Sequence, residues 1–157
     1  RLKRPENKAN AMRWPTPHLQ WDVVCVDWMS LPDSKGFDTV FVMTDMGTRM
    51  IHIEPCTKNM TGEEAARAFV KNVIRLYGCP SVILSDRDVR VNSEIWQETM
   101  KRLKIKHIRT TAFEPHATGR AERSNRLILD TLRKLNIQHS SENERMSENF
   151  EWLIILS

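Results

Sequence analysis

Apolar and polar positions recur along this chain with two different periods, and each period predicts a different kind of element. Three segments have the alternation or the continuous apolar run of β-strands, and they cover residues 21–28, 38–45 and 49–55. The first is almost entirely apolar, like a central strand buried on both faces, whereas the third alternates like a half-exposed edge strand. Because only short turns separate the three, at 32–36 and 46–48, we expect an antiparallel meander.

The next part of the chain has helical spacing. Residues 61–77 begin with Thr61 and Glu64, the arrangement of a capping box, and continue with apolar residues three and four positions apart. Gly78 ends this predicted helix. A strand at 81–85 follows, and because a helix precedes it, this strand should run parallel to an earlier one.

Four further elements are expected in the rest of the chain. A helix begins at Ser93, a fifth strand covers 105–109, and a long helix runs over about 119–135. The apolar stretch 150–156 has the pattern of a helix start without an end signal, so we expect the last helix to be truncated. The order of elements predicts an α/β fold with a five-stranded mixed sheet flanked by helices.

Acidic residues stand at three notable points of this pattern. Asp27 and Asp86 each end an apolar run, and Glu122 lies near the start of the long predicted helix, with thirty-five residues between it and Asp86. Carboxylates suit hard cations such as Mg²⁺ or Mn²⁺, and two such ions can activate a nucleophile and stabilise a leaving oxygen in phosphodiester chemistry. An aspartate at a strand end also commonly begins a turn, and the helix dipole favours a glutamate in a first helical turn. Spacing alone therefore leaves a structural role open for all three acids.

The segments around these acids resemble the integrase catalytic core of gypsy-type LTR retrotransposons and, more distantly, of retroviruses. They are WDVVCVDWMSLP (21–32), FVMTD (41–45), YGCPSVILSDRD (77–88) and EPHATGRAERSN (114–125), in the order that the family has. The resemblance runs from about Pro15 to the end of the chain. It implies an RNase H-like fold, and it matches Asp27, Asp86 and Glu122 to the family's catalytic, metal-binding acids.

The resemblance also implies an activity and its partners. The implied enzyme is a polynucleotidyl transferase and endonuclease that processes DNA 3′ ends and transfers them into target DNA, with two Mg²⁺ or Mn²⁺ ions. The implied partners are element-end DNA, target DNA and further copies of the chain, in the nucleus or otherwise within the cell. A zinc module precedes such a core in the family, but no cysteine occurs before Cys25, so we expect that module to be absent. Residues 1–20 are then a basic linker and residues 21–157 the integrase core.

The loop before Glu122 departs from the family pattern. Glu114 replaces the usual histidine, residues 116–118 are His-Ala-Thr instead of Gln-Thr-Asp, and Arg120 replaces a glutamine. No catalytic acid is lost. Two alternatives therefore stay open beside an active integrase: a decayed or domesticated module for DNA binding and assembly, and a related nuclease with the same fold.

A row of arginines at the start of the long predicted helix is a candidate DNA contact. Arg120, Arg123 and Arg126 recur every three residues. Guanidinium groups and helix N-termini both bind anions, so such a row beside a metal site favours contact with DNA phosphates. His116 in the preceding loop is a further candidate contact. The same row is equally typical of a solvated helix face.

Other polar residues near these positions are interpreted as structural. Asp88 lies two residues beyond Asp86, past the expected end of the strand, where it should anchor a turn. The histidines and serines of the chain, among them His107, His116 and Ser124, lack the context of a catalytic triad, so covalent catalysis is not expected.

Composition changes this picture little. The 157 residues are 28% charged and 40% apolar with a net charge of +4, which fits one soluble globular domain and permits a nucleic-acid partner without requiring one. No apolar run is long enough for a membrane span. The three cysteines lack metal-site spacing, so we expect buried thiols rather than a zinc site or a disulfide framework.

Overall fold

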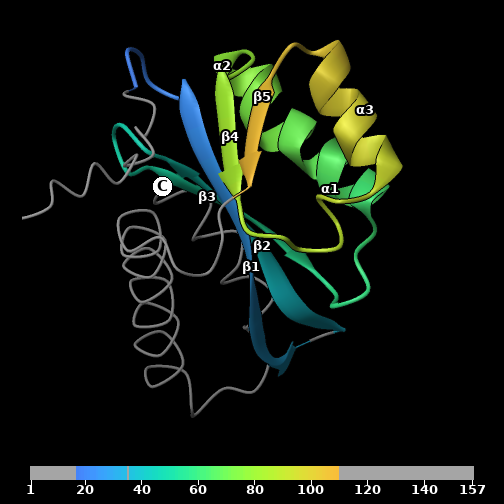
Figure 1. Cartoon of the computed structure of the whole chain (residues 1–157). Helices are drawn as coiled ribbons and strands as arrows, with labels where there is room; N and C mark the ends of the chain where they lie inside the picture. Colours follow the sequence, from blue (N-terminus) through green and yellow to red (C-terminus); the bar gives the residue numbers. More distant parts are fainter. Residues whose placement is uncertain (1–16, 35, 110–157) are drawn as a thin grey trace, which may run out of the picture.

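A five-stranded mixed sheet forms the centre of the molecule in the computed structural model, which describes residues 17–34 and 36–109 (Figure 1). The strands are β1 (Val23–Ser34), β2 (Phe37–Asp45), β3 (Ile51–Cys56), β4 (Val82–Ser85) and β5 (Lys106–Arg109). Their order across the sheet is β3-β2-β1-β4-β5. The first three strands form the expected antiparallel meander, while β4 runs parallel to β1 and β5 runs parallel to β4. The predicted meander and the predicted parallel direction of β4 are therefore confirmed.

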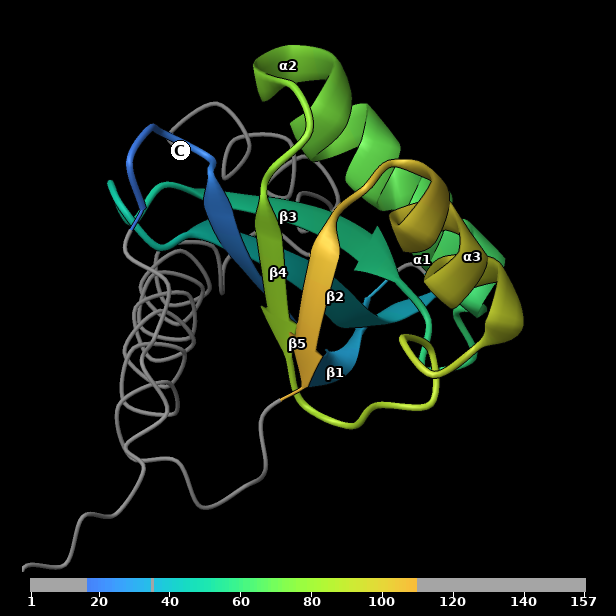
Figure 2. The same ribbon diagram turned by 45° about the horizontal axis from the view of Figure 1, so that its top comes forward.

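Helices pack on one face of this sheet, and together they enclose the main hydrophobic core (Figure 2). They are α1 (Gly62–Phe69), the π-helical segment η1 (Val70–Ile74), α2 (Arg75–Tyr77) and α3 (Glu94–Arg102). Alternate strand residues, among them Val24, Phe41 and Ile83, face the helices. Phe69 and Trp96 fill the helix side of this core, and all five of these side chains are fully buried.

The signals at the helix ends act as the sequence predicts. The Thr61 hydroxyl accepts from the backbone N–H of Glu64, and the Glu64 carboxylate accepts from the N–H of Thr61, so the capping box is complete. Ser93 caps α3 by accepting from the N–H of Trp96, and Gly78, with a φ of 89°, ends the first helical stretch. The π-helical turn η1 was not predicted, because apolar spacing does not distinguish a π-helical turn from an α-helical one.

The first strand is longer than predicted, and this changes the position of a candidate site residue. β1 ends at Ser34 and not near Trp28, so Asp27 lies within the strand and not at its end. The chain after Trp28 stays extended because it pairs with β2, through Ser30 opposite Thr39 and Ser34 opposite Phe37. Local composition did not show this, since Pro32 and Asp33 are typical turn residues.

Two predictions about burial are wrong. The alternation of the third predicted strand would leave His52 on its exposed side, but His52 is 6% exposed, lies 2.7 Å from the Tyr77 hydroxyl and packs beside Trp21. Cys79 was expected to be a buried thiol and is exposed, whereas Cys56 is buried. His52 is buried because Trp21 and Tyr77, which lie far from it in the sequence, pack against it.

The face of the sheet away from the helices carries two smaller apolar clusters. One is built on Val23, Val82 and Leu84, and the other includes Val40 and Ile53. The long helix predicted near 119–135 and the truncated last helix lie outside the described residues. None of the helices in the described part of the chain is long and apolar enough to cross a membrane.

Candidate active site

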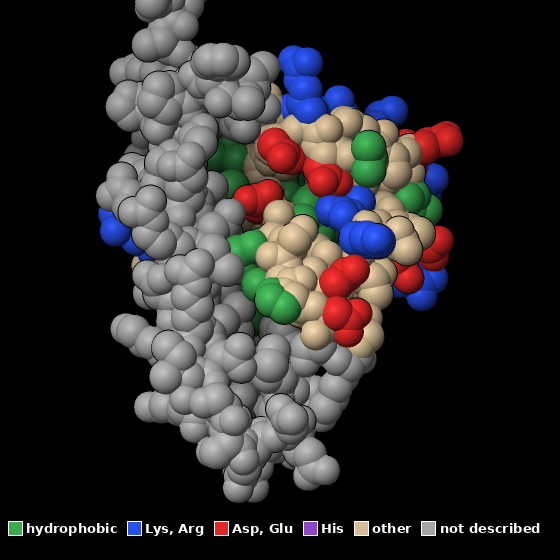
Figure 3. Space-filling view, turned by 90° about the horizontal axis from the view of Figure 1, so that it is seen from below, with side chains coloured by type: hydrophobic (Ala, Val, Ile, Leu, Met, Phe, Trp, Pro, Cys, Tyr) green, Lys and Arg blue, Asp and Glu red, His purple; other side chains and the backbone are tan. Residues whose placement is uncertain are grey.

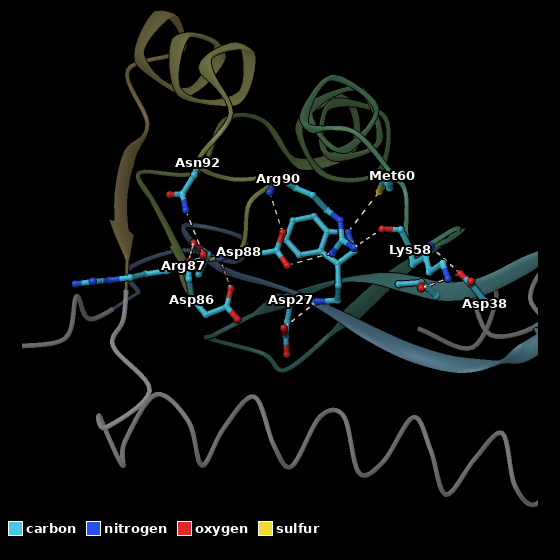
Figure 4. Close-up of polar contacts among 12 residues, drawn as sticks. Asp27, Asp38, Lys58, Met60, Asp86, Arg87, Asp88, Arg90 and Asn92 are labelled. Atoms are coloured by element: carbon cyan, nitrogen blue, oxygen red, sulfur yellow. Dashed lines mark hydrogen bonds and ion pairs between the residues drawn. The ribbon is translucent and has the colours of Figure 1, made fainter.

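Asp27 and Asp86 occupy matching positions on two neighbouring parallel strands. The last pair of the β1–β4 ladder is Cys25 opposite Leu84, and β4 ends one residue later at Ser85. Asp27 and Asp86 each lie two residues beyond that pair, so the two residues reach the same level of the sheet. Figure 4 shows their carboxylates side by side and pointing to the same side of β1. The structure thus brings together two of the three acids that the sequence singled out.

Alternation along β1 decides which face of the sheet carries this pair. Asp27 shares its face with Val23 and Cys25, while Trp28 turns to the opposite face and packs against the helix core. Of the helices that the structure describes, none packs on the Asp27 face. Viewed from below, the described part of the surface carries acidic side chains next to basic ones (Figure 3).

The carboxylates of Asp27 and Asp86 carry like charges and repel each other. Burial raises the pKa of the Asp86 carboxyl, and the nearby charges of Asp27 and Asp88 raise it further. The backbone N–H of Asp88 and the Arg90 guanidinium act in the opposite direction. The same two acids affect Cys25. Burial raises the pKa of its thiol to about 12, and the charges of Asp27 and Asp86 raise this pKa further. A bound dication relieves such repulsion, so the electrostatics of this pair favour metal binding.

Local hydrogen bonds orient both carboxylates. Asp27 Oδ1 accepts from the N–H of Trp28 at 2.8 Å, and Asp86 Oδ1 accepts from the N–H of Asp88 at 3.0 Å. A carboxylate has about four acceptor sites on its two oxygens, so a backbone hydrogen bond leaves capacity for a cation. Asp86 therefore begins a turn and also remains a candidate metal ligand.

Asp88 anchors this turn, as its position past the strand predicts. Its Oδ1 accepts from the N–H of Arg90 at 2.9 Å, and its Oδ2 lies 3.2 Å from the Arg90 guanidinium. Asn92 closes the turn further by donating to the carbonyl of Arg87 at 3.1 Å. Arg90 was not singled out in the sequence, where it reads as one more charged residue of a polar turn.

A series of hydrogen bonds holds the end of β4 on the helix side. The Ser85 hydroxyl donates to the carbonyl of Asp86 at 2.8 Å, and His107 Nε2 lies 2.7 Å from the Ser85 hydroxyl oxygen. The Gln97 amide donates to the carbonyl of Val91 and lies 3.3 Å from His107 Nδ1. These directions require the neutral Nε2–H tautomer of His107, which donates to Ser85 and accepts from Gln97. No local sequence signal points to this role, because it depends on the parallel pairing of β4 with β5, which places His107 opposite Ile83.

Replacing His107 by glutamine should make the protein less sensitive to mild acid. Burial lowers the pKa of His107 to about 4, and the charge of Arg109 acts in the same direction. The unfolded chain binds this proton below about pH 6.5, so the unfolded state holds more protons between pH 6.5 and 4 and stability falls as the pH is lowered through that window. After allowance for solvent contact, we expect a loss of about 1 kcal/mol between pH 7 and 5 that His107→Gln does not show.

Thermal unfolding at pH 7 and pH 5 measures this difference directly. The acid-induced drop in Tm should be smaller in His107→Gln than in the wild type by roughly 2–4 °C. Burial also lowers the pKa of His52, and both proteins retain that group, so the comparison isolates His107. An equal drop in both proteins would contradict the assignment.

The remaining predicted site residues lie outside the described part of the chain. They are Glu122, His116, Arg120, Arg123 and Arg126. Within residues 17–34 and 36–109, no group of three His, Cys, Asp or Glu side chains could hold a metal ion. Among the described residues the Asp27–Asp86 pair is the candidate donor set, because Mg²⁺ is usually bound through one or two carboxylates and keeps several waters.

Comparison with known proteins finds relatives that cover most of the chain. A family model described as "Integrase core domain" matches residues 15–115. The Tf2-3 and Tf2-4 transposon polyproteins of Schizosaccharomyces pombe are 30% identical to this chain over 120 residues, which is 76% of the chain. The chain spans 9% of the length of these two curated relatives.

Solved structures of retroviral integrases share the architecture. The HTLV-2 integrase catalytic core domain, in complex with magnesium and in a trimeric form, has a TM-score of 0.71 and 21% identity, over 88% of this chain and 86% of that chain. The simian T-cell lymphotropic virus intasome, in complex with PP2A regulatory subunit B56 gamma, has a TM-score of 0.75 and 19% identity, over 90% of this chain and 50% of that chain. At these identities the similarity confirms the RNase H-like fold that the family resemblance implies.

Proposed function

This chain belongs to the integrase core domain family, and on that basis we propose that it is the catalytic core of a gypsy-type retroelement integrase. In this role it processes the 3′ ends of element DNA and transfers them into target DNA. The observation that carries the proposal is the placement of Asp27 and Asp86 at the same level of two neighbouring parallel strands. Both acids lie in segments that resemble the family, 21–32 and 77–88, and the similarity to retrotransposon polyproteins supports the same reading.

Both proposed reactions are in-line displacements at phosphorus, first by water and then by a DNA 3′-hydroxyl. Two Mg²⁺ or Mn²⁺ ions, when bound, supply a nucleophile at neutral pH and stabilise charge on the leaving oxygen. Asp27 contributes a carboxylate from within a strand paired to β2, so its backbone is rigid. Asp86 contributes a second carboxylate from a turn that Asp88 and Arg90 fix, and we assign Glu122 as the third.

The organisation of the proposed protein follows the same resemblance. Residues 1–20 form a basic linker, and residues 21–157 form the integrase core. Copies of the chain assemble around element and target DNA in the nucleus. The dimeric and trimeric forms of the HTLV-2 core and the intasome of the simian virus support assembly of this kind.

Strand resealing on a branched DNA tests the proposed activity. A branched duplex that mimics an integration product is incubated with the purified chain and Mn²⁺. We expect the 3′-hydroxyl of the nicked target strand to attack the branch-point phosphodiester, which restores the target strand and releases the element end. EDTA should abolish both products, because the ions supply the chemistry.

The same assay separates the alternatives that the sequence left open. Cleavage of the branched DNA without resealing would indicate a related nuclease. Binding of the DNA without conversion would indicate a domesticated or decayed module for DNA binding and assembly. Either result contradicts the proposed function.

Removing two arginines of the predicted helix should weaken binding to all DNA sequences alike. Phosphate contacts supply affinity without sequence information, so Arg120→Ala combined with Arg123→Ala should lower affinity for any duplex. The dependence of log affinity on log salt should become shallower by about one unit for each lost contact, and so by about two units in the double variant.

A matched control removes equal charge from the helix-covered side. Arg67 and Arg102 are 78% and 79% exposed and pair with Glu63 and Glu98 on α1 and α3. Arg67→Ala combined with Arg102→Ala should leave both affinity and salt slope unchanged. If the Arg120/Arg123 variant behaves like this control, the arginine row is a solvated surface and the DNA path lies elsewhere.

A further inference from the structure

Arg90, in the turn after β4, joins that turn to the loop after β3 (Figure 4). Its Nη1 lies 3.2 Å from Asp88 Oδ2, and its Nη2 donates to the carbonyl of Lys58 at 2.9 Å. The backbone N–H of Lys58 donates in turn to Asp38 of β2 at 2.7 Å, so the loop that Arg90 contacts is itself fixed to the sheet. Although it is charged, the Arg90 side chain is only 12% exposed.

The same guanidinium lies over the indole of Trp28, the neighbour of Asp27 in β1. Its central carbon is 4.8 Å from the ring centroid. The indole stacks with Phe41 at a centroid distance of 4.4 Å, and its Nε1–H donates to the sulfur of Met60 at 3.4 Å. Trp28 is therefore held by β2 and by the segment before α1, and it offers Arg90 a fixed surface.

These contacts connect the two carboxylates of the candidate site in an unbroken series. Asp27 accepts from the N–H of Trp28, and Trp28 supports Arg90. Arg90 pairs with Asp88, whose own N–H is bonded to Asp86. We propose that Arg90 is a positioning residue: it clamps the turn that carries Asp86 onto β1 and so sets the separation of the Asp27 and Asp86 carboxylates for a divalent cation. The inference rests on the proposed function, because it takes these two acids as the metal ligands.

The contacts require an arginine and not simply a cation. A planar guanidinium rests on an indole and donates in two directions at once, whereas a lysine ammonium is a single point charge without a plane. A lysine at this position would therefore keep the charge but not this set of contacts.

Metal affinity, measured by calorimetry with Mn²⁺ alone, tests the clamp without requiring catalysis. Arg90→Gln should raise the Kd for Mn²⁺ at least about tenfold, the lower end of what loss of a supporting group costs. Arg90→Lys keeps the positive charge but lacks the planar guanidinium that donates in two directions. It should therefore give an intermediate Kd for Mn²⁺. Strand resealing should fall in the same order at limiting Mn²⁺ and recover in part at high Mn²⁺, which a residue that only stabilises the fold would not show.

Arg87 provides a control matched in charge and position. It lies next to Asp86, is exposed, and forms no ion pair with the described carboxylates. Arg87→Gln should change the Kd for Mn²⁺ by less than about twofold. An equal loss of affinity in Arg87→Gln would assign the effect to charge and overturn the clamp, and so would an unchanged Kd in Arg90→Gln.

Two further outcomes are decisive. If Arg90→Gln does not fold, Asp88→Asn removes the ion pair but keeps Oδ1 as the acceptor for the Arg90 N–H. Asp88→Asn must then raise the Kd, and an unchanged Kd overturns the clamp. A wild-type chain without saturable Mn²⁺ binding contradicts the proposed function itself. Normal binding by the wild type together with an unaffected Arg90→Gln contradicts the clamp alone.

Discussion

Replacing Asp86 by asparagine should abolish DNA strand transfer while leaving the protein as stable as the wild type, or more stable. The amide keeps the acceptor oxygen that receives the N–H of Asp88, so the turn persists. It loses the negative charge, and removing one preorganised electrostatic group costs roughly 10²–10³-fold in rate or more. The pKa of the Asp86 carboxyl is raised by burial and by the charges of Asp27 and Asp88. A carboxyl whose pKa is raised on folding loses its favourable contribution as the pH rises through that pKa, so at pH 7 the ionised group carries a cost that asparagine removes.

Metal-dependent stabilisation gives this prediction a second readout. A ligand that binds only the folded state adds about 2.7 kcal/mol at 100 times its Kd, so Mn²⁺ should raise the Tm of the wild type. Asp27→Asn, Asp86→Asn and Glu122→Gln should each lose strand transfer and most of this shift. As a control, Asp33→Asn changes an exposed acid of β1, the strand that carries Asp27. This variant should behave like the wild type. Near-wild-type catalysis in any one of these three variants would contradict the assignment of the three acids as metal ligands.

Asp86 could be placed from the sequence because the signals that place it are local. A short apolar run, a serine and an aspartate predict a strand followed by a turn, and β4 ends at Ser85 as that pattern indicates. Asp27 was placed in the right strand but at the wrong point within it. Whether β1 ends after Trp28 is decided by hydrogen bonds to β2, such as those around Ser30 and Thr39, and no local propensity contains that information.

The roles of Arg90 and His107 could not be predicted from the sequence, because they also depend on contacts with distant parts of the chain. A charged residue in a polar turn is usually solvated, but Arg90 is largely covered through its contacts with Lys58 and Trp28, which lie about 30 and 60 positions earlier in the chain. His107 was set aside because it has no triad context, and its role follows from contacts with Ser85 and Gln97 that only the packed sheet and helix create. Sequence patterns therefore identified the groups proposed to act on substrate, while tertiary structure was needed to identify the groups that hold them.

Gly62→Ala should lower the stability of the protein by about 3 kcal/mol, because the start of α1 touches the turn that carries Arg90. An added Cβ would overlap the Ser93 side chain and lie 2.7 Å from the carbonyl oxygen of Arg90. The Ser93 hydroxyl donates to that carbonyl and accepts from the N–H of Trp96, so it cannot move away without uncapping α3. Overpacking typically lowers stability by about 1–3 kcal/mol. Because the Arg90 carbonyl is a backbone group and can move little, we expect the upper end of that range and a Tm lower by roughly 6–12 °C.

Two controls separate this contact from general effects on the fold. At Gly47 an added Cβ would meet its neighbours at 3.6 Å, so Gly47→Ala should change stability by less than about 0.5 kcal/mol. Val73 of η1 is fully buried in the main hydrophobic core. Val73→Ala opens a cavity there and should lower stability by roughly 2 kcal/mol without moving the turn that carries Arg90. If the clamp holds the metal ligands, Gly62→Ala should also weaken Mn²⁺ binding in the folded protein, because it displaces the Arg90 backbone. Equal Mn²⁺ affinity in Gly62→Ala and Val73→Ala would show that the close approach of α1 to this turn supports only the fold.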